Sequence, residues 1–179
     1  MRRIRLTGEG LTLADLEAIA AREAHVSLSP ASRRKIAASR KIVDRLARRG
    51  TVAYGITTGF GRFSDVVIPK DRLAELQKNL VRSHAAGVGA PLSPPFVRAM
   101  IALRANTLAK GFSGIRVATV EALLAMLAAD VLPVVPEQGS VGASGDLAPL
   151  AHLALGLIGE GEAFRRGRRM PTAAALRAA

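Results

Sequence analysis

The feature that most constrains this fold is an apolar, helix-length segment that begins directly after a glycine-rich one. Residues 147–159 read LAPLAHLALGLIG, so a helix over them is apolar on every side. Such a helix is not stable on the surface of a monomeric domain, because its exposed faces would keep apolar area in water. We expect neighbouring elements to cover it. The chain has few helices to spare, which points to a partner subunit or further chain.

The rest of the sequence is predicted to be mainly α, with a few short strands near the start. Thr12 and Asp15 form a capping box that opens a helix. Residues 51–70 contain three glycines and no helical period, so they are predicted to form a long loop. An extended or turn-like piece is expected over 25–30, and further helices over 31–49, 71–85, 93–110, 116–129 and onward from an Asp146 N-cap.

The formal net charge of +12 raises a nucleic-acid hypothesis, but the pattern of charges does not favour it. Many arginines lie in residues 33–49, where apolar residues at helical spacing occupy the opposite face. Aromatic residues make up 3% of the chain, which is too few for base-stacking platforms. A solvated basic face is therefore the favoured interpretation.

The chain has no cysteine, which excludes disulfides and thiolate metal sites and indicates a reducing cytoplasm. His25 lies near a predicted turn, and His152 lies in the apolar segment, where a buried, hydrogen-bonded core residue is expected. Neither has a histidine or carboxylate at the spacing that a metal site requires, so no metal is expected. The apolar segments carry charges and prolines or are too short to span a bilayer, so no membrane association is expected.

The glycine-rich segment, GSVGASGD at 139–146, matches none of the common glycine motifs. No lysine follows it, which excludes a Walker loop, and its glycine spacing is not GxGxxG. Asp146 stands where a GxSxG nucleophile elbow requires glycine.

Two interpretations of this segment remain open, an ordinary loop and a bend in which the backbone itself reacts. In the second, the Gly145 nitrogen bonds to the Ala143 carbonyl carbon. Loss of that carbonyl oxygen and of the Ser144 hydroxyl as water would leave an electrophilic five-membered ring. The N-terminus of the following helix would stabilise negative charge that develops on such a ring.

His84 continues an apolar stripe on the helix predicted over 71–85. The stripe is formed by Leu73, Leu76, Leu80 and His84. Because these positions share one helix face, His84 is predicted to point inward. From this pattern alone, a hydrogen-bonded core histidine and a site histidine both remain open.

Four segments, in this order, resemble the aromatic amino acid ammonia-lyases, enzymes that carry a 4-methylidene-imidazol-5-one (MIO) group. They are TVAYGITTGFG (51–61), NLVRSHAAGVGAPL (79–92), RANTLAKGFSGIR (104–116) and VPEQGSVGASGDLAPLAHLALGLIGEGEA (135–163). The resemblance implies the N-terminal part of the helical, fumarase/aspartase-like fold of this family. It also implies that Ala143, Ser144 and Gly145 form the MIO and that Asp146 assists the cyclisation.

The same resemblance implies roles for Tyr54 and His84. Tyr54 matches the tyrosine that is proposed to remove the substrate's β-proton. The pair Ser83-His84 is similar to family members that act on histidine, whereas those acting on tyrosine or phenylalanine tend to have His-Leu or Phe-Leu. A histidine here can hydrogen-bond a substrate imidazole, which a leucine cannot, so L-histidine is the expected substrate.

The expected function is therefore that of a carbon–nitrogen lyase, which eliminates ammonia non-oxidatively from L-histidine to give urocanate in histidine degradation. The family implies a homotetramer that needs no metal or diffusible cofactor. Family members are much longer, so residues 1–179 are expected to be an N-terminal portion that lacks the C-terminal helical bundle and is inactive alone. The alternatives are a phenylalanine- or tyrosine-type lyase or aminomutase, and a non-catalytic basic helical module that binds an acidic partner.

Overall fold

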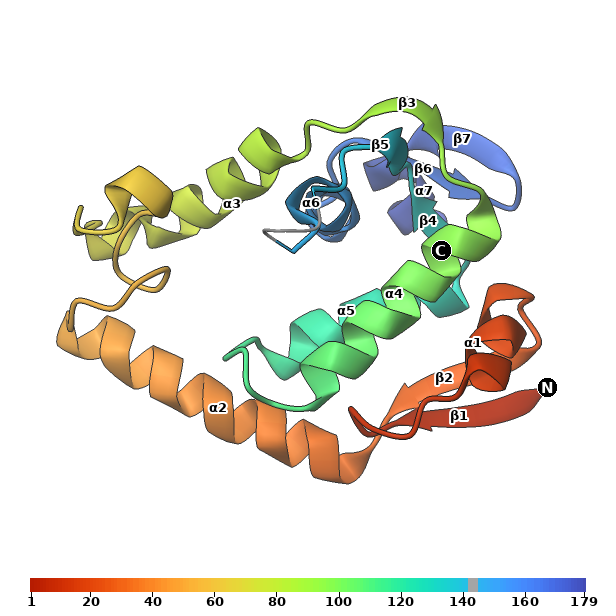
Figure 1. The fold of residues 1–179 in the computed structure, drawn as a ribbon, viewed down its shortest axis with the longest axis horizontal. Coiled ribbons are helices and arrows are strands. Elements are labelled where there is room, and N and C mark those ends of the chain that lie inside the picture. The colour runs from red at the N-terminus through yellow and green to blue at the C-terminus, as the bar shows by residue number, and fades with distance from the viewer. Residues whose placement is uncertain (142–144) are drawn as a thin grey trace.

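A computed structural model, which describes residues 1–141 and 145–179, shows that the chain begins with a β–α–β unit (Figure 1). Strands β1 (Arg2–Leu6) and β2 (Ala24–Leu28) pair in parallel. Helix α1 (Leu13–Ala20) connects them. It starts with the predicted capping box, in which the hydroxyl oxygen of Thr12 accepts a hydrogen bond from the Asp15 N–H at 3.1 Å. The unit places the N-terminal residues against one side of the helical core.

Two long helices and the loop between them form an arm at the opposite side of the molecule (Figure 1). Helix α2 (Pro30–Arg49) ends at Gly50, whose φ of 67° is a left-handed conformation that glycine adopts without strain. The predicted loop follows, with 3-10 turns at Gly61–Phe63 and Lys70–Arg72. Helix α3 (Leu73–His84) then runs back towards the body.

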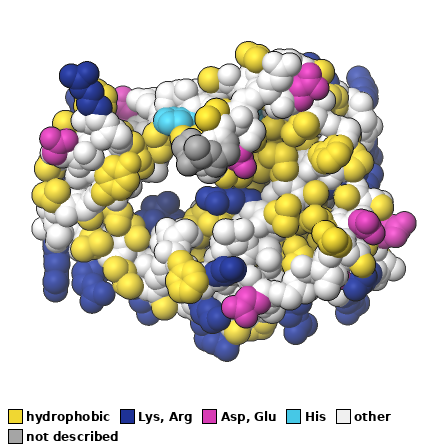
Figure 2. Space-filling view, in the orientation of Figure 1, with side chains coloured by type: hydrophobic (Ala, Val, Ile, Leu, Met, Phe, Trp, Pro, Cys, Tyr) yellow, Lys and Arg dark blue, Asp and Glu magenta, His cyan; other side chains and the backbone are white. Residues whose placement is uncertain are grey.

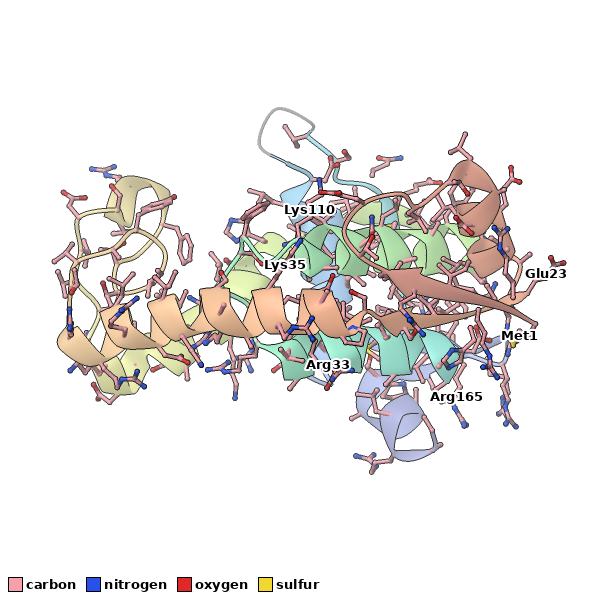
Figure 3. The ribbon with its side chains drawn as sticks, turned by 90° about the horizontal axis from the view of Figure 1, so that it is seen from below. Met1, Glu23, Arg33, Lys35, Lys110 and Arg165 are labelled. Carbon is pink, nitrogen blue, oxygen red and sulfur yellow. The ribbon has the colours of Figure 1, made fainter. Side chains whose placement is uncertain are left out.

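Helix α4 (Pro94–Ala109) lies at the centre of the core. Its buried side chains are those of Val97, Ile101, Ala102, Ala105, Leu108 and Ala109. Helix α5 (Val117–Ala128) packs beside it, and α2 runs along the underside of both, as Figure 3 shows. Ile36 of α2 is fully buried in this layer, so the basic helix is joined to the core through its apolar face.

A buried carboxylate fixes the point where α5 ends and the next strand begins. Asp130 is 5% exposed and adopts a φ of 54°. The guanidinium of Arg98, on α4, donates to it from Nε at 3.0 Å and from Nη2 at 2.9 Å. Arg98 also donates to the carbonyl of Ala20, and Arg22 approaches the second carboxylate oxygen at 3.2 Å. One acidic side chain therefore links α1, α4 and the end of α5.

The remaining described elements are two small antiparallel sheets and two helices. Strands β3 (Val88–Pro91) and β5 (Pro136–Gln138) form one sheet. The other has the order β4–β6–β7, and the two helices are α6 and α7. The bounds of these elements are Val131–Pro133 for β4, Leu147–Leu157 for α6, Glu162–Arg165 for β6, Arg168–Pro171 for β7 and Thr172–Arg177 for α7.

The mainly α fold is confirmed, and each predicted helix is present with ends shifted by a few residues. Strands also occur well beyond the start of the chain, and the β6–β7 hairpin was not predicted, because its polar, basic sequence has no apolar alternation. The apolar α6 buries Ala151, Leu153 and Gly156, whereas Leu147 is 48% exposed. In the residues that the structure describes, no helix has the length and apolarity needed to cross a membrane.

The ion pair at Asp130 leads to a stability prediction. Arg98→Met should lower the free energy of unfolding by about 3 kcal/mol or more, because it leaves a buried carboxylate without its main partner. Arg22→Met should cost less than about 1 kcal/mol, since the Arg22 side chain is 54% exposed. Urea unfolding of both variants measures the difference. Equal losses would show that Arg98 is not the partner on which the buried charge depends.

Candidate active site

The glycine-rich segment reaches the start of α6, and the structure describes its two ends. Ala143 and Ser144, the first two predicted MIO precursors, lie outside the described residues. Gly145 is exposed, and among the residues that the structure describes, apart from its chain neighbours, none would have an atom within 4 Å of a Cβ built on it. The described part of the chain therefore leaves the Gly145 α-carbon uncovered on that side.

Asp146 occupies the N-cap position of α6, as predicted, but it does not cap the helix with its side chain. Its φ of 54° turns the backbone into the left-handed region. The carboxylate instead accepts a hydrogen bond from the hydroxyl of Ser140. The predicted capping bond is thus replaced by a contact between the two ends of the segment 140–146. Ser140 was not predicted as part of the site, because one more serine in a polar segment gives no distinguishing signal.

His84 is the last residue of α3, and its ring is held by its own helix. Its Nδ1 lies 2.9 Å from the Leu80 carbonyl oxygen and 3.0 Å from the Ser83 hydroxyl. A carbonyl oxygen can only accept, so Nδ1 is the donor in this bond, and in the neutral ring Nε2 is then the acceptor. The predicted stripe of Leu73, Leu76, Leu80 and His84 is half-buried, while most of the other α3 side chains are exposed. The ring therefore offers an acceptor nitrogen at the inner end of the helix.

The backbone after His84 crosses the segment that leads to the glycine-rich loop. The N–H of Gly87 donates to Nε2 of His152, on α6, at 3.1 Å. A Cβ on Gly87 would lie 3.2 Å from the Gln138 carbonyl oxygen, and one on Gly139 would lie 3.1 Å from the Gly87 α-carbon. Both positions therefore favour glycine, because a side chain there would press against a second backbone. The structure thus brings the end of α3 next to residues 138–139 and α6.

Two further interactions hold the same crossing. Strand β3 pairs with β5, with Val88 opposite Gln138. Arg82 donates two hydrogen bonds to the carboxylate of Glu160, at 2.8 Å and 2.6 Å, and these bonds lower the pKa of that carboxyl. The α3 end is therefore joined to α6 and its following turn by both backbone and side-chain contacts.

His152 differs from the core histidine that its apolar surroundings predict. The predicted hydrogen bond is confirmed, but the side chain is half-buried, and its partner is the loop that follows His84. Burial lowers the pKa of the imidazole from its ordinary value of 6.5. Since Nε2 accepts from an N–H, the ring is neutral with its proton on Nδ1.

Tyr54 lies away from this crossing within one chain. Its loop precedes α3, whereas His84 ends that helix, and 12 residues of helix span about 18 Å. The Tyr54 ring packs edge-on against Phe60, with centroids 5.9 Å apart, and its hydroxyl oxygen accepts from the Gly61 N–H at 3.3 Å. The side chain is 63% exposed. The structure therefore brings residues that follow His84 next to residues on either side of Gly145 in the sequence, whereas Tyr54 lies apart from both.

The basic face predicted on α2 is present and forms an open groove. Figure 2 shows Lys and Arg side chains gathered along the edge of the molecule that α2 forms, and a hollow between α2, α3 and α4. The groove itself is a separate, shallow surface on the outward face of α2, and the cations and apolar residues that line it are Arg34, Ala37, Ala38, Lys41, Ile42, Arg45 and Arg48. Among the described residues, no group of three or more His, Asp or Glu side chains is arranged to hold a metal ion.

Comparison with known proteins gives one consistent result. The family model for aromatic amino acid lyases matches residues 11–179. Histidine ammonia-lyase from Myxococcus xanthus is 57% identical over 174 residues, which cover 97% of this chain and 34% of that protein.

Two solved structures extend this similarity to the fold. The histidine ammonia-lyase of Trypanosoma cruzi superposes with a TM-score of 0.91 at 42% identity, over 98% of this chain and 34% of that one. A tyrosine aminomutase from Streptomyces globisporus gives 0.90 at 40% identity, over 98% and 33%. The chain thus spans about a third of the length of the proteins that it matches.

The neutral state of His152 predicts how stability depends on pH. Because burial lowers its folded-state pKa, the unfolded chain binds the proton first, so stability is lost as pH falls below the ordinary value of 6.5. The melting temperature should therefore fall between pH 7.5 and 5.5, above the range in which carboxylates titrate, and His152→Gln should flatten this change. The same substitution at the exposed His25 is the control. An unaltered pH dependence in His152→Gln would contradict the assignment.

Proposed function

We propose that this chain, which belongs to the aromatic amino acid lyase family, is the N-terminal portion of a histidine ammonia-lyase. The complete enzyme would eliminate ammonia from L-histidine to give urocanate, as a cytoplasmic homotetramer. The observation that carries the proposal is the position of the His84 ring, which is held at the end of α3 just before Gly87 contacts His152 and the segment that leads to Ala143, Ser144 and Gly145. The 57% identity to a histidine ammonia-lyase supports the same substrate.

The chemistry of His84 suits an imidazole substrate. An unprotonated Nε2 accepts a hydrogen bond, and a neutral substrate imidazole has one N–H to donate. A phenylalanine ring has no such donor, so it would leave the lone pair of Nε2 unsatisfied in the closed site. A tyrosine hydroxyl can donate, and the similarity to a tyrosine aminomutase makes L-tyrosine the second candidate substrate.

The residues at the start of α6 fit the MIO group. Ala143, Ser144 and Gly145 would form it, and it would supply an electrophile that no side chain of the chain provides. The open side of Gly145 suits a residue whose backbone has to react, and the helix that begins at Leu147 directs its N-terminus towards that position. Asp146, which Ser140 holds by a hydrogen bond, would assist the proton transfers of ring closure.

Tyr54 would act as the base for the β-proton, and its position explains why one chain does not suffice. Its hydroxyl is at the far end of α3 from His84, so it would serve the site of another subunit or be brought into place by the rest of the enzyme. The chain spans about a third of its relatives, so the remaining pocket residues and the C-terminal helical bundle would come from further sequence. The 179-residue chain alone is expected to be inactive.

A chimera tests the proposal directly. Residues 1–179 replace the matching N-terminal third of the Myxococcus xanthus enzyme, and the product is assayed for urocanate and ammonia. We expect activity with L-histidine and an intact mass lower by two water molecules, with both lost in Ser144→Ala. A chimera that carries the mass deficit but leaves L-histidine unreacted would contradict the substrate. A chimera without the deficit would contradict the MIO.

Substitution of His84 tests its role in substrate choice. In the chimera, His84→Leu should lower kcat/KM for L-histidine about tenfold or more, the effect of one lost hydrogen bond to a buried polar group. The mass deficit should be unchanged, because His84 does not take part in ring formation. Assays with L-tyrosine and L-phenylalanine accompany the measurement. A wild-type chimera that prefers L-tyrosine would support the second candidate instead.

A further inference from the structure

We infer that His152 is a positioning residue of the substrate site: by holding the Gly87 N–H, it fixes the backbone after His84 against the segment before Ala143. This inference rests on the proposed function, since it assigns a role in that same site. The role assigned to His152 involves no contact with the substrate or with the reacting atoms. It acts through the backbone that carries His84.

The geometry leaves the His84 ring little independence from Gly87. Only Ala85 and Ala86 separate the two residues, and the Ala86 N–H donates to the His84 carbonyl at 2.8 Å, which closes a tight turn. The ring itself is tied to its helix through Leu80. A displacement of Gly87 would therefore move the end of α3, and the ring with it.

The opposite side of the contact is the segment that leads to the predicted MIO residues. Gln138 and Gly139 approach Gly87 so closely that an added Cβ on either glycine would lie within 3.2 Å of a backbone atom. His152 follows Asp146 by six residues on the helix that starts there. The imidazole thus joins the helix after the glycine-rich segment to the turn after His84, at the point where the strand before that segment also approaches Gly87.

The other side-chain link at this end of α3 is less shielded from water. The side chains of Arg82 and Glu160 are 52% and 36% exposed, so water screens their attraction. His152 is more shielded from water, and it accepts from the N–H of Gly87, which lies beyond the end of α3. The Gly87 contact is therefore the better shielded of these two side-chain links between the end of α3 and α6.

The contact needs a neutral acceptor at the position of Nε2, and two substitutions separate this need from packing. Glutamine places its side-chain oxygen close to where Nε2 lies and keeps the acceptor. Phenylalanine keeps a planar ring of similar size but has no acceptor. A residue that serves only to fill space would tolerate phenylalanine better than glutamine.

The test measures both the contact and its effect on the site. In the 179-residue chain, exchange of the Gly87 amide with solvent is followed by NMR, and we expect it to be at least tenfold faster in His152→Phe than in wild type or His152→Gln. In the chimera, His152→Phe should raise KM for L-histidine about tenfold with a smaller change in kcat, and His152→Gln should restore KM to within about twofold. Counting sites by the mass deficit corrects for any loss of formed enzyme.

The outcomes distinguish this inference from the proposed function. An unprotected Gly87 amide in the wild-type chain would overturn the inference whatever the chimera does. A chimera that is active on L-histidine and whose KM is unaffected by His152→Phe would overturn it while the proposed function stands. A wild-type chimera without activity on L-histidine would contradict the proposed function and remove the role in binding, whereas the Gly87 exchange would still report whether the contact exists.

Discussion

The burial of one broad face of helix α4 is the constraint on which the other elements depend. Its inward positions are 0–3% exposed, and three of them are alanines, which let neighbouring helices approach closely. Helices α1, α2 and α5 are each partly apolar, and each meets this requirement by placing its apolar face against the same core. The charge of Asp130 is tolerated within this core because the side chain of Arg98 extends from α4 and pairs with it.

The candidate site receives its rigidity from this core through a short stretch of chain. Leu132 and Val135 are buried among the core residues, and the Val135 carbonyl accepts from the Leu92 N–H. The following residues form β5 and cross the turn after His84 before the chain reaches Asp146. The segment 131–139 therefore packs into the core at one end and borders the site at the other. The site can then tolerate an exposed Gly145, because its flanks are fixed elsewhere.

The long helices and the family could be predicted from the sequence, and both are confirmed. Apolar spacing, prolines at helix starts and the glycine after Arg49 are local signals, and the helices that they predict are present in the folded chain. The β6–β7 hairpin could not be predicted, because its polar, basic sequence has no apolar alternation and β6 also pairs with β4, more than 25 residues earlier. The contact of His152 with Gly87 joins residues 65 apart, and no spacing in the sequence reports it. The roles of Tyr54, His84, Asp146 and the MIO precursors stay predictions, and the placement of Tyr54 shows how little a motif says about which residues meet within one chain.

The contact between Gly87 and Gly139 has a consequence for redesign of this protein. Because neither position has room for a side chain, the two backbones meet at a fixed point, and only Ala85 and Ala86 separate that point from His84. The fold therefore fixes the length of this two-residue spacer, whereas it does not fix the residue types. On the proposed function, exchanging side chains at positions 83–86 would change the preferred amino acid. Inserting or deleting a single residue there would instead rotate the end of α3 and aim a different side chain at the site.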